Sequence, residues 1–441
     1  MTGLSIGLTL FAALLVLLVV RVPIGIAMFA VGAGGYVVLT DGTGAVLVQF
    51  LKSLVYARLS NYDIVVIPLF LLMGQFATQG GLSRALFQCA EAFLGHRPGG
   101  VAMAAVGACA GFGAICGSSL ATAATMGQVA LPELRRLGYS GSLATGTLAA
   151  GGTLGIMIPP SVPLVIYAIL TQESIGKLFV AAIVPGILAM LGYMAVIRLT
   201  VWWRPHTGPA GPRTDWGTRA KVLWQVLPVL LVFVVVVVGI YGGWANPTEA
   251  AALGAAACGL LAWARGGLDR RTLVEALLGM AQTTAMIYLV LLGADMLNAT
   301  LALSQAPVEL AAWVQAQAWP PLLVLAVILL VYLGLGCVMD SLAMILLTIP
   351  IFYPLVMGLD LFGLSAPDKS VWFGILALMV VEIGLVHPPV GMNVYIINRL
   401  APGVPLLDTY KGVLPFLLSD LLRVAALIAW PALTLTLVHA R

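Results

Sequence analysis

Apolar stretches recur along the whole chain and are separated by short polar turns. A helix that spans a bilayer takes roughly 20 predominantly apolar residues. Eight stretches are about that long: 4–20, 24–39, 63–79, 177–203, 222–240, 248–264, 281–299 and 412–438. Two further crossings are predicted at 143–171 and 371–401, although each contains a double proline. This pattern predicts an all-α polytopic membrane protein that is surrounded by a lipid bilayer.

The two double prolines carry most of the functional information. Pro159-Pro160 and Pro388-Pro389 lie 229 residues apart (388 − 159), and each follows a glycine and three further residues. Proline lacks the backbone donor and clashes with the preceding turn, so the helix must break there. In hydrocarbon a broken helix is tolerated only where protein or a watery cavity satisfies the freed groups. Such paired breaks point to the binding site of a transporter.

Further matches between the two halves keep the same order along the chain. They are Gly74 with Gly293 and Gly117 with Gly336 at an offset of 219, and Pro185 with Pro415 at an offset of 230. This predicts a duplication. Each half contains five predicted crossings, and an odd number turns the second copy upside down. The predicted organisation is a first inverted repeat at 1–204, a cytoplasmic linker at 205–221 and a second inverted repeat at 222–441.

Two apolar segments are interrupted by glycines and are predicted to be re-entrant hairpins. Residues 98–138 contain Gly111, Gly113 and Gly117, with the tip expected near 116–122. Residues 319–357 form the counterpart, with the tip expected near 336–342. The alternative, that each segment is two ordinary short spans, stays open on sequence grounds.

Composition and charge agree with a membrane protein and suggest its orientation. Charged residues make up only 9% of the chain, against about 25% in soluble domains, and the mean hydropathy is +1.07. The net charge of +4 implies no nucleic-acid partner. Basic residues gather at 204–221 and 265–271, which the positive-inside rule places in the cytoplasm. Both termini are then predicted to be periplasmic. Lys52 and Arg58 disagree with this scheme, so the orientation of 45–62 stays open.

The sequence offers little for enzymatic chemistry. Its four histidines and five cysteines are scattered without metal-ligand spacing, and it contains no phosphate-binding G-x-x-x-x-G-K-[ST] loop. No Ser/His/Asp constellation points to hydrolysis. We therefore expect neither an enzyme nor an organic cofactor.

Irregular backbone at the two tips and the two helix breaks is expected to meet near the middle of the membrane. Unwound carbonyls coordinate small hard cations, and the N-termini of half-helices favour anions. This favours Na⁺ and a carboxylated solute. The candidate substrate-binding residues are Ser118, Ser119, Thr122, Ser161, Asp340 and Asn393.

Asp340 is the sharpest single candidate, because a carboxylate within a membrane segment is functional by default. A purely structural role, capping the second half-helix of its hairpin, stays open. His387 is interpreted as a local hydrogen-bonding residue, and Glu382 is left without a role.

Several longer motifs together resemble the large membrane subunit of tripartite ATP-independent periplasmic (TRAP) transporters. They include Gly117-Ser-Ser-Leu-Ala-Thr-Ala-Ala-Thr-Met126, Gly151-Gly-Thr-Leu-Gly-Ile-Met-Ile-Pro-Pro-Ser161 and Met339-Asp340 with Thr348-Ile-Pro350. The resemblance covers nearly the whole chain. It implies an elevator-type fold with Na⁺-coupled uptake of an organic acid, such as a C4-dicarboxylate, sialic acid or another sugar or keto acid.

The resemblance also implies partners, a location and ion sites. The expected partners are a separate small four-helix membrane subunit and a periplasmic substrate-binding protein, and the expected location is the bacterial inner membrane. The implied residues of the first Na⁺ site are Ser118, Ser119, Gly152, Thr153 and Gly155, and those of the second are Gly336, Asp340, Gly384 and Pro388. The alternative function is a stand-alone carboxylate transporter, or a channel, that needs no binding protein.

Overall fold

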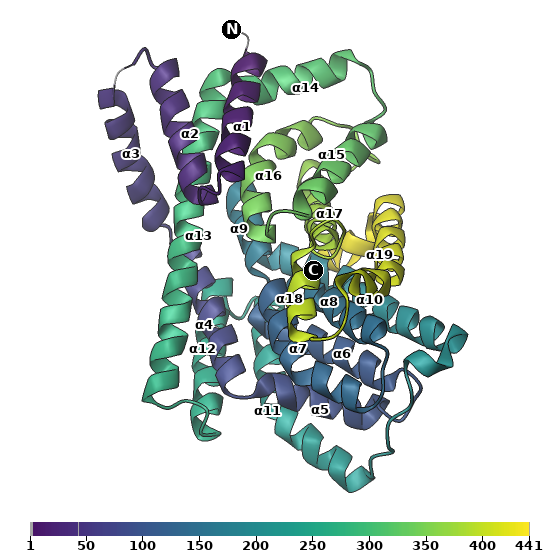
Figure 1. Ribbon diagram of the computed structural model, residues 1–441. Helices are drawn as coiled ribbons and strands as arrows, with labels where there is room; N and C mark the ends of the chain where they lie inside the picture. Colours follow the sequence, from purple (N-terminus) through teal and green to yellow (C-terminus); the bar gives the residue numbers. More distant parts are fainter. Residues whose placement is uncertain (1–2, 43, 441) are drawn as a thin grey trace.

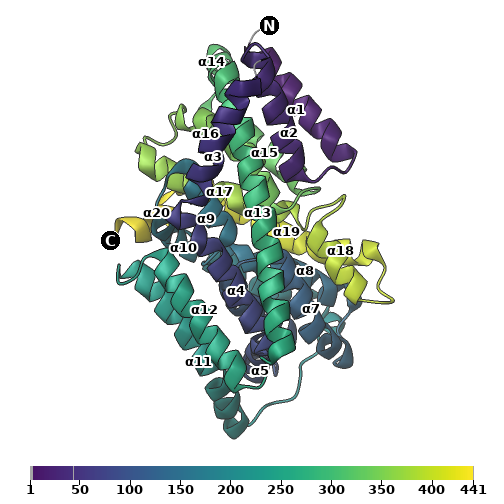
Figure 2. The ribbon, with the colours of Figure 1, turned by 90° about the vertical axis from the view of Figure 1, so that its left-hand side faces the viewer.

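Residues 3–42 and 44–440 are described by the computed structural model, and every regular element in them is helical (Figure 1). This confirms the predicted all-α class. Within these two ranges, four helices are long and apolar enough to cross a membrane, or up to six if each bent helix pair counts as one span. The longest, α13 (Arg270–Ser304), stands upright along one side of the molecule in Figures 1 and 2.

One set of helices, here called the lateral group, gathers around α13. α2 packs along α13 and α12 packs along α4, as the side view in Figure 2 shows. The members besides α13 are α1 (Gly3–Val19), α2 (Ile24–Leu39), α3 (Gly44–Leu59), η1 (Tyr62–Val65), α4 (Val66–Gln79), α11 (Trp216–Tyr241) and α12 (Pro247–Ala264).

Most of the remaining helices form a second set, the hairpin group, in which α6, α7 and α19 all pack against α8. Its members are α6 (Gly100–Cys116), α7 (Ser119–Arg136), α8 (Gly141–Met157), α9 (Val162–Thr171), α10 (Ile175–Trp203), α15 (Pro321–Gly336), α16 (Ser341–Met357), α17 (Ala366–Gly384), α18 (Met392–Leu400) and α19 (Leu406–Ala429).

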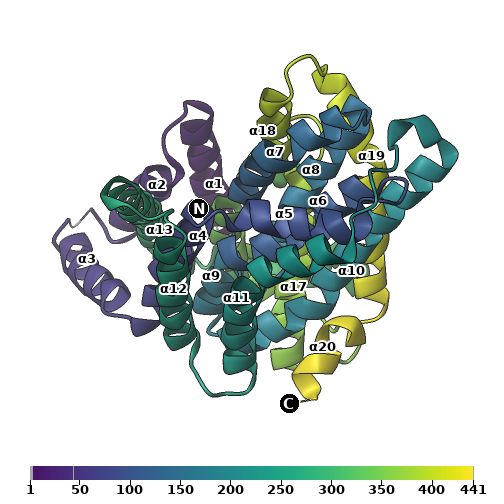
Figure 3. The same ribbon diagram turned by 90° about the horizontal axis from the view of Figure 1, so that it is seen from below.

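Two short helices connect the groups from opposite ends of the molecule. α14 (Ala306–Ala316) crosses the top of Figure 1 between α13 and α15. α5 (Leu82–Leu94) follows α4, leads into α6 and lies across the lower end of the molecule, as the view from below shows (Figure 3). The short η2 (Pro205–Thr207) follows α10, and α20 (Ala432–His439) lies near the C-terminus.

The predicted breaks and tips appear at the expected places. α8 and α9 are bent by 41° across the first double proline, and the second double proline lies between α17 and α18. Both double prolines contain a cis peptide bond. The interruption between α6 and α7 falls at 117–118, and that between α15 and α16 falls at 337–340. Both lie within the predicted tip ranges.

The crossing predicted at 412–438 is present as a helix long and apolar enough to span a membrane, but its bounds differ. The helix α19 starts earlier, at Leu406, and ends at Ala429, and α20 starts only at Ala432. Pro431 separates the two, because proline cannot donate the hydrogen bond that would continue α19. Local hydrophobicity runs across this point without a gap, so hydropathy alone suggests a single span.

Arg58, which disagreed with the charge-based orientation, has a structural partner. It lies in the last turn of α3 and forms an ion pair with Asp295 of α13, with Arg58 Nε 2.6 Å from Asp295 Oδ2. The side chains are only 17% and 11% exposed. This ion pair holds the end of α3 against α13, and the orientation of 45–62 stays open.

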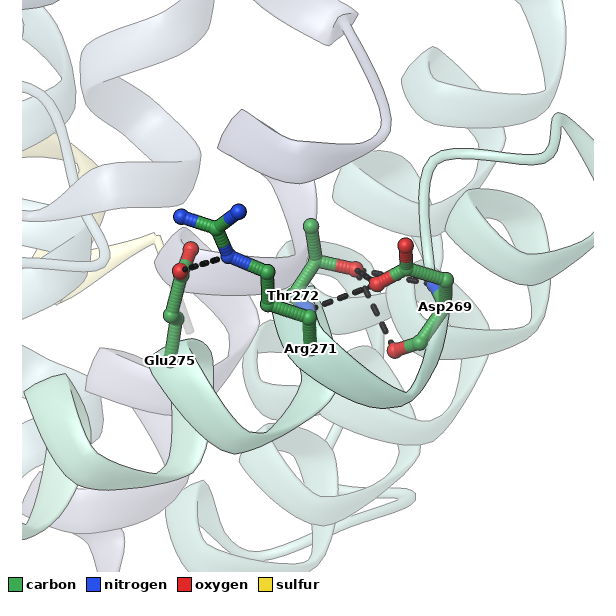
Figure 4. A network of polar contacts seen from close by, with 4 residues as sticks. All are labelled: Asp269, Arg271, Thr272 and Glu275. Carbon is green, nitrogen blue, oxygen red and sulfur yellow. Dashed lines mark hydrogen bonds and ion pairs between the residues drawn. The ribbon is translucent and has the colours of Figure 1, made fainter.

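The first turn of α13 is held by a reciprocal cap (Figure 4). The carboxylate of Asp269 accepts from the Thr272 backbone N–H at 2.7 Å, and the Asp269 N–H donates to the Thr272 hydroxyl at 2.8 Å. Arg271 donates to Glu275 one turn further on, at 2.9 Å. With 35 residues α13 is roughly 50 Å long, so this cap lies beyond the apolar span.

Replacing Asp269 by alanine is expected to speed amide hydrogen exchange in the first turn of α13 about fivefold at neutral pH, because the cap is lost. Asp269→Asn is the matched control, since asparagine caps equally well. The hydrogen bonds from the backbone N–H and hydroxyl of Thr272 lower the pKa of Asp269. The wild-type cap is therefore present at neutral pH and weakens only as the pH falls below about 4. Unchanged exchange in the alanine variant would contradict the capping role.

Candidate substrate and ion site

The first tip is built by a glycine followed by a capping serine. Gly117 ends α6 with φ of 63°, a left-handed conformation that other residues rarely adopt. Ser118 then caps α7, and its hydroxyl accepts from the Ala121 backbone N–H at 3.4 Å. This sharp reversal brings the N-terminus of α7 to the end of the hairpin.

The second tip places Asp340 at the corresponding capping position. Its carboxylate accepts from the backbone N–H groups of Leu342 at 3.2 Å and Ala343 at 3.3 Å, at the start of α16. The capping role considered from sequence is therefore observed. It leaves the predicted ion-binding role open, since a carboxylate offers further lone pairs.

Each hairpin crosses its neighbouring broken helix at a pair of glycines. A methyl group at Gly113 would lie 2.9 Å from the backbone nitrogen of Gly155, and one at Gly384 would lie 2.5 Å from the Cα of Gly336. Real Cβ atoms do not approach that closely. The glycines thus let the backbone of each hairpin touch the helix that breaks.

The backbone oxygens just before each break lack their usual partners. In an α-helix the carbonyl of residue i accepts from the N–H of residue i+4. For Gly155 and Gly384 those residues are Pro159 and Pro388, which have no N–H. The Gly384 carbonyl accepts instead from the His387 N–H at 3.2 Å. Both carbonyls lie where a hairpin crosses the broken helix, as expected for ligands of a small cation.

The last turn of α8 meets the first tip closely. A methyl group at Gly155 would lie 2.7 Å from the Ser118 carbonyl oxygen and 2.9 Å from the Thr122 Cβ. The Thr122 hydroxyl is buried without a hydrogen-bond partner among the described residues. The Thr153 hydroxyl points elsewhere, donating to the Ala150 carbonyl at 2.7 Å. Any contribution of Thr153 to an ion site would come from its backbone.

A cavity of about 340 Å³ lies where both tips, both broken helices and the lateral group meet. Three helix N-termini reach it, those of α7, α9 and α16. Leu71 of α4 and Thr283 and Met286 of α13 close it on the side of the lateral group. Asp340 is its only ionisable lining residue in the described part of the chain. The anion-favouring ends of three helices thus face a cavity that no basic side chain of the described residues lines.

The predicted substrate-binding residues separate into two sets. Ser118, Ser119 and Asp340 line the cavity. Thr122, Ser161 and Asn393 are fully buried and are absent from its lining. The amide of Asn393 donates to the Ala149 carbonyl at 3.3 Å, while its Oδ1 and the Ser161 hydroxyl have no partner in the described structure. Their role in binding stays a prediction.

The second break is held by contacts that the sequence did not suggest. The Tyr410 hydroxyl of α19 lies 2.8 Å from the Pro389 carbonyl and 2.7 Å from that of Val390. The Cys337 thiol lies 3.5 Å from the Pro388 carbonyl, which His387 Nδ1 also contacts. The interpretation of His387 as a local hydrogen-bonding residue agrees with this geometry.

A buried polar network behind the first break was also missed. The Tyr193 hydroxyl lies 3.0 Å from Thr153 Oγ1 and donates to Asp420 at 2.9 Å, and Asp420 pairs with Arg423 at 2.9 Å. Arg423 Nη2 reaches the Met157 sulfur at 3.6 Å. Charges at 420 and 423 within an apolar helix were the available signal, because such residues are expensive in a membrane.

Comparison with known proteins agrees with this architecture. The sequence profile of the family described as "Tripartite ATP-independent periplasmic transporter, DctM component" matches residues 11–433. The chain is 37% identical over 382 residues to the C4-dicarboxylate TRAP transporter large permease protein DctM of Pseudomonas aeruginosa, covering 86% of each chain. It is 31% identical over 429 residues to the sialic acid TRAP transporter large permease protein SiaM of Vibrio cholerae, covering 96% of each.

A solved structure extends the comparison to the fold. The crystal structure of the Alcanivorax borkumensis YdaH transporter matches with a TM-score of 0.63 over 88% of this chain and 89% of that one. The sequence identity is 16%, so this likeness concerns the fold alone. The family profile, in contrast, spans nearly the entire sequence. The chain therefore belongs to the DctM component family, the large membrane permeases of tripartite ATP-independent periplasmic transporters.

Proposed function

We propose that this permease carries out Na⁺-coupled uptake of an organic acid. The observation that carries the proposal is the cavity of about 340 Å³, to which three helix N-termini converge and which no Lys, Arg or His of the described residues lines. Helix N-termini stabilise an anion. Relatives are named for C4-dicarboxylates and sialic acid, which are both carboxylates.

The need for a coupling cation follows from charge. A carboxylate in this cavity would lie near Asp340, and like charges repel strongly where water is scarce. Bound Na⁺ ions would offset that repulsion, so solute and ion bind better together than apart. We propose the first ion site at Ser118, Ser119, Gly152, Thr153 and Gly155 and the second at Gly336, Asp340, Gly384 and Pro388. The Gly155 carbonyl, whose usual donor is replaced by Pro159, supports the first site. The Gly384 carbonyl accepts from the His387 N–H at 3.2 Å and has a further lone pair for the second site.

The connections between the groups are consistent with an elevator mechanism. The cavity lies at the boundary between the hairpin group and α4 and α13 of the lateral group. α5 and α14 connect the two groups at opposite ends (Figures 1 and 3). We propose that the hairpin group slides along the lateral group and carries the cavity across the bacterial inner membrane, with both termini periplasmic. A separate small membrane subunit and a periplasmic substrate-binding protein would complete the transporter.

Uptake in proteoliposomes tests this function. The chain is reconstituted with its small subunit and binding protein, and radiolabelled C4-dicarboxylates, sialic acid and other sugar acids are offered. Accumulation is expected only with an inward Na⁺ gradient and is expected to collapse with a Na⁺ ionophore, while an equal K⁺ gradient serves as control. Accumulation without a Na⁺ gradient would refute the coupling. Full activity without the binding protein would instead support a stand-alone transporter or channel.

A further inference from the structure

A single buried carboxylate connects the two hairpin tips. Glu382 of α17 is completely buried. One of its carboxylate oxygens accepts from the Ser119 hydroxyl, and the other accepts from the Ser341 hydroxyl at 2.6 Å. Ser119 is the first residue of α7 and Ser341 the first residue of α16. Glu382 therefore contacts both tips at the same time.

Burying the Glu382 carboxylate has a desolvation cost that no basic side chain of the described residues offsets. Among the described residues it forms no ion pair, and it does not line the cavity. An apolar residue of similar size would avoid the desolvation cost. A carboxylate, however, has two oxygens that accept from two hydroxyls simultaneously. Glu382 thus accepts two hydrogen bonds at once, one at each carboxylate oxygen.

The bridge is not repeated in the first half of the chain. At the offset of the double prolines, the position that corresponds to Glu382 is Thr153 (382 − 229). The Thr153 hydroxyl bonds within α8 and contacts Tyr193, and it reaches neither tip serine. A single side chain from the second half of the chain thus contacts both hairpins, with no counterpart at Thr153 in the first half. A helix-packing device shared by both repeats would have appeared twice.

We propose that Glu382 is a positioning residue that couples the two tips, so that ordering one tip favours the ordered form of the other. Each tip serine lies next to a capping residue that lines the cavity, Ser118 or Asp340. Once a ligand has ordered one tip, ordering the second tip would then cost less conformational entropy. The consequence for transport rests on the proposed Na⁺ coupling, whereas the mechanical coupling does not.

Amide hydrogen exchange in detergent tests the coupling without any transport. Ser119→Ala is expected to speed exchange at the opposite tip, residues 340–344, and Ser341→Ala to speed it at 118–122. The expected factor is about tenfold, as for loss of one hydrogen bond to a charged group. Thr125→Ala is the matched control: it removes a hydroxyl from α7 beyond the tip that does not contact Glu382, and exchange at 340–344 should stay unchanged. Unchanged exchange at the opposite tip in both variants would overturn the proposal.

Substitution of Glu382 itself separates bridging from charge. Glu382→Gln is expected to retain slow exchange at both tips, because an amide accepts from one serine and donates to the other. Glu382→Leu is expected to loosen both tips. In proteoliposomes the leucine variant should raise the Na⁺ concentration for half-maximal uptake about tenfold, with a smaller change in maximal rate. If glutamine fails as leucine does, the charge matters and the bridge is refuted. Absence of Na⁺ dependence in the wild type would refute only the proposed function.

Discussion

Asp340→Asn is expected to lower the initial rate of Na⁺-driven uptake about 100-fold, the range expected for loss of one charged ligand, while the protein stays folded. Asparagine retains an oxygen that can cap α16, so the helix start is preserved. What disappears is the only ionisable side chain that lines the cavity in the described structure. The measurement is initial uptake in proteoliposomes, with detergent gel filtration and thermal unfolding as checks of folding.

Asp360→Asn provides the matched control for this experiment. Asp360 lies exposed in the loop after α16, and its replacement makes the same chemical change and the same change in net charge. We expect wild-type uptake from it. Asp340→Ala should lose uptake as well and should also be less stable, by about 1 kcal/mol for the lost cap. Wild-type transport by Asp340→Asn would remove this residue from the ion site and leave it with a capping role alone.

Gly155→Ala is expected to abolish uptake for a steric reason. The added methyl group would lie 2.7 Å from the Ser118 carbonyl oxygen and 2.9 Å from the Thr122 Cβ. Either the first tip moves away from α8 or the proposed ion site is filled. Overpacking of this kind costs about 1–3 kcal/mol, and the upper end is expected here because a backbone atom is among those that would have to move. If that cost applies to the ion-bound state, we expect uptake to fall about 100-fold. Uptake and the Na⁺ dependence of thermal unfolding measure it.

The control for Gly155→Ala is another glycine within a helix of the hairpin group. A methyl group at Gly107 of α6 would meet only the end of the Met194 side chain, at 3.4 Å, so Gly107→Ala should transport normally. Alanine is favoured over glycine in helices by about 1 kcal/mol, so loss of helix propensity cannot explain a defect at either position. If Gly155→Ala transports like the wild type, the close approach of tip and broken helix is not required.

Most of the backbone architecture was predictable because it depends on local features. A double proline breaks a helix wherever it occurs, and the structure has breaks at both. Glycine followed by a capping residue reverses the chain, as at Gly117-Ser118. The end of α19 was not predicted, because the apolar run continues beyond Pro431. Hydropathy averages over many residues and does not register a single missing backbone donor.

The candidate site was predictable in its location but not in its detail. The serine and aspartate tips were identified, and Ser118, Ser119 and Asp340 do line one cavity. The complete burial of Thr122, Ser161 and Asn393 was not predicted, because burial depends on which neighbours cover a side chain in the folded protein. The polar network of Tyr193, Asp420 and Arg423 was missed for the same reason.

The sequence by itself determined the membrane class, the position of both helix breaks, the two tips and the family. These features depend on residue type and on spacing along the chain, which the sequence contains in full. Only the tertiary structure decided that Glu382 reaches both Ser119 and Ser341, which lie 263 and 41 residues away. Contacts over such separations depend on how helices pack, and packing depends on the shapes of many side chains at once.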